Sequence, residues 1–228
     1  MEHEKILELL CTLTASNKLV PFLGAGCSKS ILQCDWDSLM AELNIKQVKE
    51  KTNPEVAQLY VDLNGKEKLC ETLRNYLLVD GFDAEKGYIH TAIMASMSNT
   101  IYTTNQDNVM EKCMEFYGRK IYPIVKLDDL VNARPDGVSY FKFHGDLSDP
   151  DSVIFSTCDY QNRINGPETF LDIRLKADLL GKNFLFIGYS FRDDNIKYIF
   201  DYLHKRFPDK LAKSYLISYN IDKKLEKV

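Results

Sequence analysis

Hydrophobic and polar positions along the chain follow two periods, and their order predicts strands that alternate with helices. Apolar residues at positions 6, 9, 10 and 13 share one face of a helix over residues 4–16, and the apolar run at 19–23 predicts the first strand. Such alternation favours an α/β fold with a mainly parallel sheet. Further strands are expected at residues 100–103, 121–125, 139–143, 152–155, 183–187 and 215–218, and further helices from about 107, over 167–180 and over 193–207.

The segment from about residue 34 to residue 95 interrupts this alternation. It is helical in pattern, has no convincing strand, and is broken at Asn53-Pro54 and Asn64-Gly65. We therefore expect a single domain over residues 1–228: a Rossmann-like, mainly parallel sheet flanked by helices, with an inserted helical module at about 34–95. The polar tail after the last expected strand is compatible with a natural chain that continues past residue 228.

Composition narrows the class of protein. With 45% hydrophobic and 27% charged residues and a formal net charge of −4, the chain has the make-up of an ordinary globular protein without a basic surface for nucleic acid. No stretch approaches the roughly 18 apolar residues of a membrane span, and the charged N-terminus is unlike a signal peptide, so we expect a cytoplasmic protein. The six cysteines form no Cys-x-x-Cys pair, so we expect no metal site.

The first expected strand runs directly into Gly24-Ala25-Gly26-Cys27-Ser28. Two glycines one residue apart let a backbone approach a ligand, and free N–H groups at the start of a helix form a cradle for phosphate. The dinucleotide fingerprint is incomplete because Lys29 stands where a third glycine is expected. A plain turn between strand and helix is the alternative. Cys27, at the start of that helix, is also a candidate for a thiol of lowered pKa.

Three other expected strands end in groups that can do chemistry: Thr104-Asn105-Gln106-Asp107, His144-Gly145-Asp146 and Gly188-Tyr189-Ser190. Ligands of open α/β sheets bind beyond the carboxyl ends of the strands, so these groups are expected to face one cleft. Each also has a structural alternative as a helix cap or a turn. The remaining histidines, His3, His90 and His204, are interpreted as structural or solvated.

In order and approximate spacing, these four segments resemble the sirtuin superfamily. The match is closer to bacterial sirtuin-like NAD-consuming domains of anti-phage defence, through Asp35-Trp36-Asp37-Ser38-Leu39, the segment 142–147 and the segment 188–194. The resemblance extends from about Leu19 to Asn220. The zinc-binding Cys-x-x-Cys pairs of the superfamily's protein deacylases are missing, and residues 33–36 replace their Pro-Asp-Phe-Arg segment.

The resemblance implies NAD as the substrate and assigns roles to single residues. Asn105 and Asp107 would lie near the nicotinamide ribose and carboxamide, and His144 would act on the ribose hydroxyls or on the attacking water. These three are the expected catalytic residues. The implied binding residues are Gly24, Ala25, Gly26 and Ser28 for the diphosphate and ribose, Thr104 beside them, Gly188, Tyr189 and Ser190 for adenosine ribose or phosphates, and Asn220 on the adenosine side.

The function that follows from this resemblance is NAD glycohydrolysis to nicotinamide and ADP-ribose. An effector that depletes NAD needs control, so we expect a homo-oligomer, a regulatory or sensor partner, or both. Two alternatives stay open: a zinc-free deacylase or ADP-ribosyltransferase, and a module that binds NAD or ADP-ribose without cleaving it. Preference between NAD and NADP also stays open.

Overall fold

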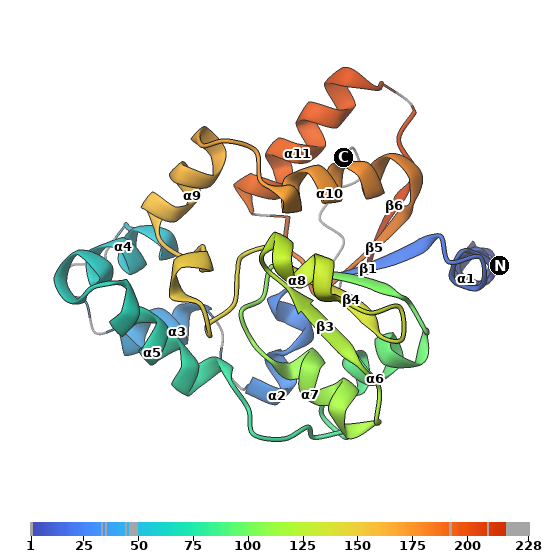
Figure 1. Ribbon diagram of the computed structural model, residues 1–228. Helices are drawn as coiled ribbons and strands as arrows, with labels where there is room; N and C mark the ends of the chain where they lie inside the picture. The colour runs from blue at the N-terminus through green and yellow to red at the C-terminus, as the bar shows by residue number, and fades with distance from the viewer. Residues whose placement is uncertain are drawn as a thin grey trace.

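In the part of the chain that the structure describes, six parallel strands form a sheet in the order β3-β4-β2-β1-β5-β6. Figure 1 shows this sheet among the helices. The computed structural model describes residues 2–32, 34, 36–43, 45, 50–191, 193–208 and 210–217. The Rossmann-like, parallel α/β fold expected from the sequence is thereby confirmed. The strands are β1 (Leu19–Leu23), β2 (Thr100–Thr103), β3 (Ile121–Ile124), β4 (Val138–Lys142), β5 (Asn183–Ile187) and β6 (Ser214–Ile217).

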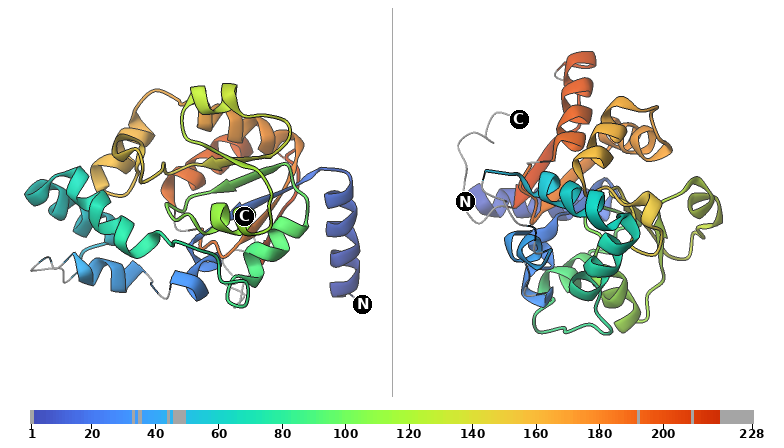
Figure 2. Two further views of the ribbon diagram at one scale, coloured as in Figure 1. Left: turned by 60° about the horizontal axis from the view of Figure 1, so that its bottom comes forward. Right: turned by 90° about the vertical axis from the view of Figure 1, so that its left-hand side faces the viewer.

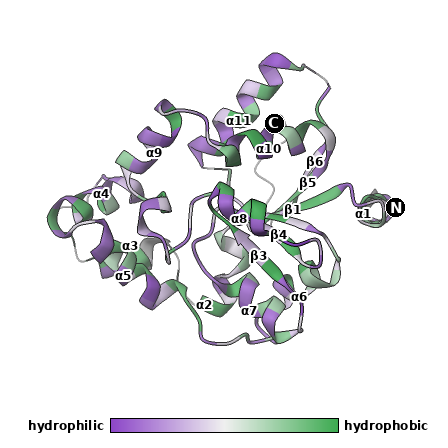
Figure 3. Cartoon of the chain, viewed as in Figure 1, coloured by the Kyte–Doolittle hydropathy of each residue, from purple (hydrophilic) through white to green (hydrophobic). Residues whose placement is uncertain are grey.

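Helices cover both faces of the sheet (Figure 2). On one face, α10 (Phe170–Gly181) and α11 (Asp194–Arg206) pack on aromatic side chains of the strands, among them Phe22 and Phe186. On the other face, α6 (Tyr88–Ala95) and α7 (Val109–Phe116) pack with inward-facing residues of β2 and β4. All five residues of β1 are buried, because helices cover this strand on both faces. Its residues are accordingly mostly hydrophobic, as the colours of Figure 3 show.

A group of helices stands beside the sheet and has a hydrophobic core of its own. It consists of α3 (Trp36–Glu42), α4 (Asn53–Asn64) and α5 (Lys66–Leu77). The segment after β4 completes this core, since Leu147, Val153 and Phe155 are buried in it. The remaining helices are α1 (Glu2–Ala15), which extends away from the body in Figure 2, α2 (Lys29–Leu32), α8 (Leu127–Asn132), α9 (Thr157–Asn165) and the short 3-10 helices η1 (Ala25–Cys27) and η2 (Pro150–Ser152).

The strand predicted at 152–155 is wrong. Residues 150–152 form η2, and the apolar side chains of 153–155 are buried without belonging to a strand. Their hydrophobicity serves the helical core rather than a sheet. The pattern also gave no sign of α9, although Ser156 and Asp159 form a capping box at its start, a signal readable from sequence. Within the described residues, no helix is long and apolar enough to cross a membrane.

A polar network ties the central strand β2 to α10. The hydroxyl of Tyr102 donates to Oδ2 of Asp178 at 2.7 Å, and Arg174 and Lys182 contact the same carboxylate at 2.9 and 3.1 Å. Tyr102 is fully buried, and the side chain of Asp178 is 9% exposed. Burial alone would raise the pKa of Asp178, but the hydrogen bonds from Tyr102 and Arg174 and the charge of Lys182 hold it below its ordinary value.

Removing the Tyr102 hydroxyl should destabilise the protein without changing its fold. Tyr102→Phe leaves one lone pair of a buried carboxylate without its donor, which costs about 1–2 kcal/mol of the free energy of unfolding. Urea unfolding at neutral pH measures this as a lower midpoint at an unchanged slope. An unaltered midpoint would show that the network contributes nothing to stability.

The same network predicts a stability loss in acid. Because the pKa of Asp178 is lower in the folded than in the unfolded protein, its stabilisation is present above an ordinary carboxyl pKa of about 4 and is lost as the pH falls through the folded value. Asp178→Asn should therefore be less stable at neutral pH and should lose less stability below pH ~4. Unfolding free energies measured from pH 7 to pH 3 test this; parallel curves for the two proteins would contradict it.

Candidate active site

The four segments singled out in the sequence follow four adjacent strands. In the order β4-β2-β1-β5, these strands end at Lys142, Thr103, Leu23 and Ile187, and each segment begins one or two residues after its strand end. The chain passes from β1 to β2 on one side and returns to β5 on the other, so this edge contains the switch point where α/β sheets bind ligands.

The two glycine turns on either side of the switch point touch each other through their backbones. The amide of Gly26 donates to the carbonyl of Gly188 at 2.9 Å, and the amide of Gly24 donates to that of Ile187 at 3.0 Å. A Cβ on Gly24 or Gly26 would meet Gly188 at 2.5 and 2.9 Å. Gly188 itself has φ +63°. Glycine is therefore required here for close backbone approach.

This contact corrects the expectation of a cradle of free N–H groups. The amides of Gly24 and Gly26 are bonded to the β5 side, and those of Cys27 and Ser28 donate to the carbonyls of Gly24 and Ala25 at 3.0 and 3.2 Å. In this conformation these four amides are not available to phosphate. Ala25 and Gly26 are nonetheless exposed, so the outer surface of the turn is open to a ligand.

Cys27 is not an activated thiol. Its side chain is 1% exposed and its Sγ donates to the carbonyl of Ile187 at 3.0 Å. Burial raises the pKa of this thiol to about 12, despite a hydrogen bond from the turn at Gly24. The idea of a thiol of lowered pKa is therefore wrong, because the position at a helix start is outweighed by desolvation.

Asn105 and Asp107 hold the turn after β2 against its neighbours. The Asn105 side-chain amide donates to the carbonyl of Gly24 at 3.2 Å, and its backbone amide donates to Oγ1 of Thr103 at 2.9 Å. Oδ1 of Asp107 accepts the amide of Val109, the first residue of α7, at 3.0 Å, although the N-cap position of that helix is held by Asn108. Asn105 is 7% and Asp107 4% exposed. Thr104, between them and the strand, is half-buried.

His144 lies under α9 and beside α11. Its Nε2 is 2.9 Å from Oδ2 of Asp193, an ion-pair contact without the alignment of a hydrogen bond, and the edge of Tyr160 covers the ring at a centroid distance of 5.4 Å. The other oxygen of Asp193 accepts the amides of Asn195 and Ile196 and caps α11. Burial would raise the pKa of Asp193, but His144 and these amides hold it below its ordinary value.

The segment after β5 divides between core and surface. The ring of Tyr189 packs on Phe22 and Phe186 at centroid distances of 5.2 and 5.5 Å, and its hydroxyl is buried with no partner among the described residues. Ser190 is exposed. Asn220, the expected adenosine-side residue, lies outside the described residues.

His90 is a residue of this site that sequence reasoning set aside. It is 1% exposed, and its Nε2 lies 3.4 Å from Oγ of Ser28, which is fully buried beneath the glycine turn. Burial lowers the pKa of His90, with the charge of Asp107 opposing the shift, so a neutral imidazole is favoured at this edge of the sheet. The available signal was its helical spacing from Ile93, which is also buried.

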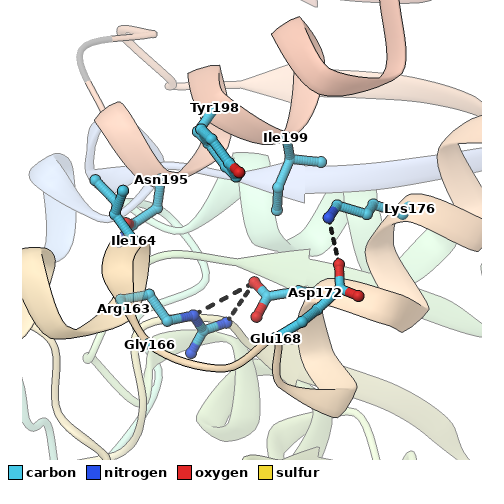
Figure 4. A pocket seen from close by; sticks show the side chains of 9 residues that line it. All are labelled: Arg163, Ile164, Gly166, Glu168, Asp172, Lys176, Asn195, Tyr198 and Ile199. Atoms are coloured by element: carbon cyan, nitrogen blue, oxygen red, sulfur yellow. Dashed lines mark hydrogen bonds and ion pairs between the residues drawn. The ribbon is translucent and has the colours of Figure 1, made fainter. Parts of the chain in front are cut away.

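A small polar cavity of about 100 Å³ lies where α9, α10 and α11 meet (Figure 4). Arg163 pairs with Asp172, and Lys176 pairs with Glu168, so the charges on its wall are matched. Asn195 is 4% exposed, and neither end of its side-chain amide has a partner among the described residues. Asn105, Asp107 and His144 do not line this cavity, so it is separate from the candidate active site.

Comparison with known proteins places this geometry in a family. A sequence profile of the SIR2-like domain matches residues 99–228, more than half of the chain. The chain belongs to the SIR2-like domain family. The matched segment carries the strand ends with Asn105, His144 and Gly188.

This SIR2-like domain is similar to several curated proteins. The NAD(+) hydrolase ThsA of Cytobacillus dafuensis is 31% identical over 202 aligned positions, covering 85% of this chain and 39% of that protein. The NAD(+) hydrolase ThsA of Acinetobacter baumannii is 29% identical, covering 97% of this chain and 47% of its own length. Defense-associated sirtuin 2 of Bacillus subtilis is 24% identical, covering 95% and 22%. The chain thus spans less than half the length of each relative.

The contact between the two glycine turns can be tested with alanine. In Gly188→Ala the new Cβ would lie 2.4 Å from the backbone nitrogen of Cys27, at a φ that L residues rarely adopt. We expect a loss of at least about 2 kcal/mol of unfolding free energy. Gly118→Ala is the matched control, because Gly118 also has a positive φ but nothing within 4 Å of its added Cβ. Equal losses of unfolding free energy in Gly188→Ala and Gly118→Ala, measured by urea unfolding, would show that the close contact between the two turns is not required for stability.

Proposed function

We propose that this SIR2-like domain is an NAD glycohydrolase, which cleaves the nicotinamide–ribose bond of NAD to give nicotinamide and ADP-ribose. We further propose that the whole chain is one NAD-binding domain, with a helical insertion at about 34–95. The names of the most similar relatives support this reaction. Their 29–31% identity extends over 85% and 97% of the chain.

One observation carries the proposal: an amide, a carboxylate and an imidazole follow adjacent strands at the ligand-binding edge of the sheet. Cleaving the bond develops positive charge on the ribose, as in glycoside hydrolysis, and nicotinamide leaves uncharged. The step therefore needs a stabilising carboxylate and a positioned base for water rather than a strong acid. Asp107, His144 and Asn105 supply these groups.

The roles follow from the chemistry of each side chain. Asn105 offers a donor and an acceptor without charge, which suits it to orient the water or a ribose hydroxyl. His144 takes the proton as water adds to the anomeric carbon. Asp107 stabilises the charge that develops on the ribose. We propose that NAD is bound by the exposed turn Ala25–Gly26 and its neighbours Gly24 and Ser28. The other proposed binding residues are Thr104, Gly188, Tyr189, Ser190 and Asn220.

We also propose a setting: a regulated, cytoplasmic effector that depletes NAD in anti-phage defence. An unregulated NAD hydrolase would be harmful to its own cell, so assembly into a homo-oligomer, a regulatory partner, or both would control it. The burial of the catalytic groups supports such control, since His144 is 3% exposed. Substrate reaches them only when their cover moves.

The test is hydrolysis of NAD by the purified protein, followed by chromatography of nicotinamide and ADP-ribose. Asn105→Ala and His144→Ala should each lower kcat by about 100-fold or more, because each removes a group that acts on the reacting atoms. His204→Ala and Asn64→Ala change exposed residues and should keep full activity. All four variants should unfold as cooperatively as the parent.

The products separate this proposal from its alternatives. Nicotinamide release without an added acceptor supports hydrolysis. Release that needs an acylated peptide or another acceptor would instead identify a deacylase or a transferase. Binding of NAD by the whole protein, in its assembled state, without nicotinamide release would identify a binding module and overturn the proposal.

A further inference from the structure

Lys142 is a buried cation at the point where the two catalytic turns come together. It is the last residue of β4, two positions before His144, and its side chain is 1% exposed. A lysine is almost never fully buried unless its charge is matched.

The ammonium group of Lys142 has three partners on three elements. It donates to the backbone carbonyl of Asp107 at 3.0 Å, to Oε1 of Glu111 on α7 at 2.9 Å, and to Oδ2 of Asp146 at 2.5 Å. An ammonium group has three protons, so this set uses its full donor capacity. One side chain thereby connects the turn after β2, the helix that follows it and the turn after β4.

The two carboxylates around Lys142 are not equivalent. Burial raises the pKa of Glu111 even though Lys142 lowers it in part, and Oε2 of Glu111 has no partner among the described residues. Burial acts in the same direction on Asp146, but Lys142 and two hydrogen bonds from Ser148 bring its pKa below the ordinary value. The surroundings of Asp146 therefore favour its charged form, whereas burial favours the neutral form of Glu111.

Asp146 also fixes the turn that carries His144. Its backbone amide donates to Oγ of Ser152 at 3.0 Å, and Oδ1 accepts both the amide and the hydroxyl of Ser148, at 2.8 and 2.7 Å. Gly145, between His144 and Asp146, has φ +82°. The Lys142 contact with Oδ2 attaches this turn to the Asp107 carbonyl, and so to the turn of Asn105.

We propose that Lys142 is a positioning residue of the active site: it fixes the Asn105–Asp107 turn and the His144 turn relative to each other, without touching substrate. This inference rests on the proposed NAD hydrolysis. Two groups on separate strands must act on one ribose, and a displacement of about 1 Å can cost on the order of 100-fold in rate. A direct link between the two turns through Lys142 holds these groups in that geometry.

Amide hydrogen exchange tests the link without any need for activity. In Lys142→Met the protected amides of both turns, those of Asn105, Val109, Gly145 and Asp146, should exchange about 10-fold faster or more than in the parent. Tyr102→Phe is the control, because it breaks a different buried network on the same sheet and should leave both turns protected. Unchanged exchange at both turns in Lys142→Met overturns the inference.

Steady-state kinetics test its consequence. Lys142→Met should lower kcat about 10- to 100-fold with KM for NAD within about threefold, because reacting groups are displaced while the binding surface stays. Tyr102→Phe, which is also destabilised, should keep kcat. An unchanged kcat, or a loss of equal size in Tyr102→Phe, overturns the positioning role and leaves only a structural one.

Single-arm variants keep the test decisive if Lys142→Met does not fold. Asp146→Asn removes the anionic arm and should loosen the His144 turn, with faster exchange and a lower kcat. Glu111→Gln resembles the neutral carboxyl and should keep both turns protected and kcat within about twofold. The reverse ranking overturns the inference. If the parent binds NAD in its assembled state without hydrolysing it, the proposed function fails, while the exchange data still decide whether Lys142 links the turns.

Discussion

The edge of the sheet depends on one backbone contact, between the turn after β1 and the turn after β5. The amide of Gly26 donates to the carbonyl of Gly188 at 2.9 Å, and any Cβ on either side would collide with the opposite backbone. This contact continues the pairing of β1 and β5 into the turns that follow them at the switch point. The side-chain amide of Asn105 then donates to the carbonyl of Gly24, so the turn after β2 takes its position from the same contact. The candidate site is built outward from there.

A second constraint is electrostatic. The edge buries ionisable groups that water would otherwise solvate, and each is stabilised in a different way. Lys142 keeps its charge because a carbonyl and two carboxyl groups surround it, Asp193 keeps its charge beside His144 and two helix amides, and for His90 burial favours the neutral form. Buried charges of this kind are costly unless matched, and replacing one member leaves its partner uncompensated. A change at one of these groups therefore acts first on its own partners, which for Lys142 lie on the turns after β2 and β4.

The fold and the meeting of the four segments could be predicted from the sequence, because parallel strands put their carboxyl ends at one edge whatever the loops do. The details that depend on packing could not. Glycines at 24 and 26 read the same in a sequence whether they bind phosphate or contact another backbone. The structure decides between these two possibilities, because Gly188, at φ +63°, lies directly against them. The pKa of the Cys27 thiol could not be predicted either, because it is set by burial, which depends on tertiary packing. The run at 153–155 has residues typical of a strand, but its side chains are buried in the core of the helical group instead of a sheet. The catalytic and binding roles of the site residues stay predictions.

The cover over His144 connects this side chain with the helical group beside the sheet. Hydrolysis of a glycosidic bond needs a single directed water, which favours catalytic groups shielded from bulk solvent. In this structure the shield over His144 includes Tyr160 of α9, and α9 is attached to the helical group by the Lys66–Asp159 ion pair at 2.6 Å and by the Cys158 amide, which donates to Gln58. A movement that uncovers His144 through α9 must therefore break these links or carry α4 and α5 with it. The cover over His144 therefore depends on contacts between α9 and the helical group, and these contacts involve none of the candidate catalytic residues.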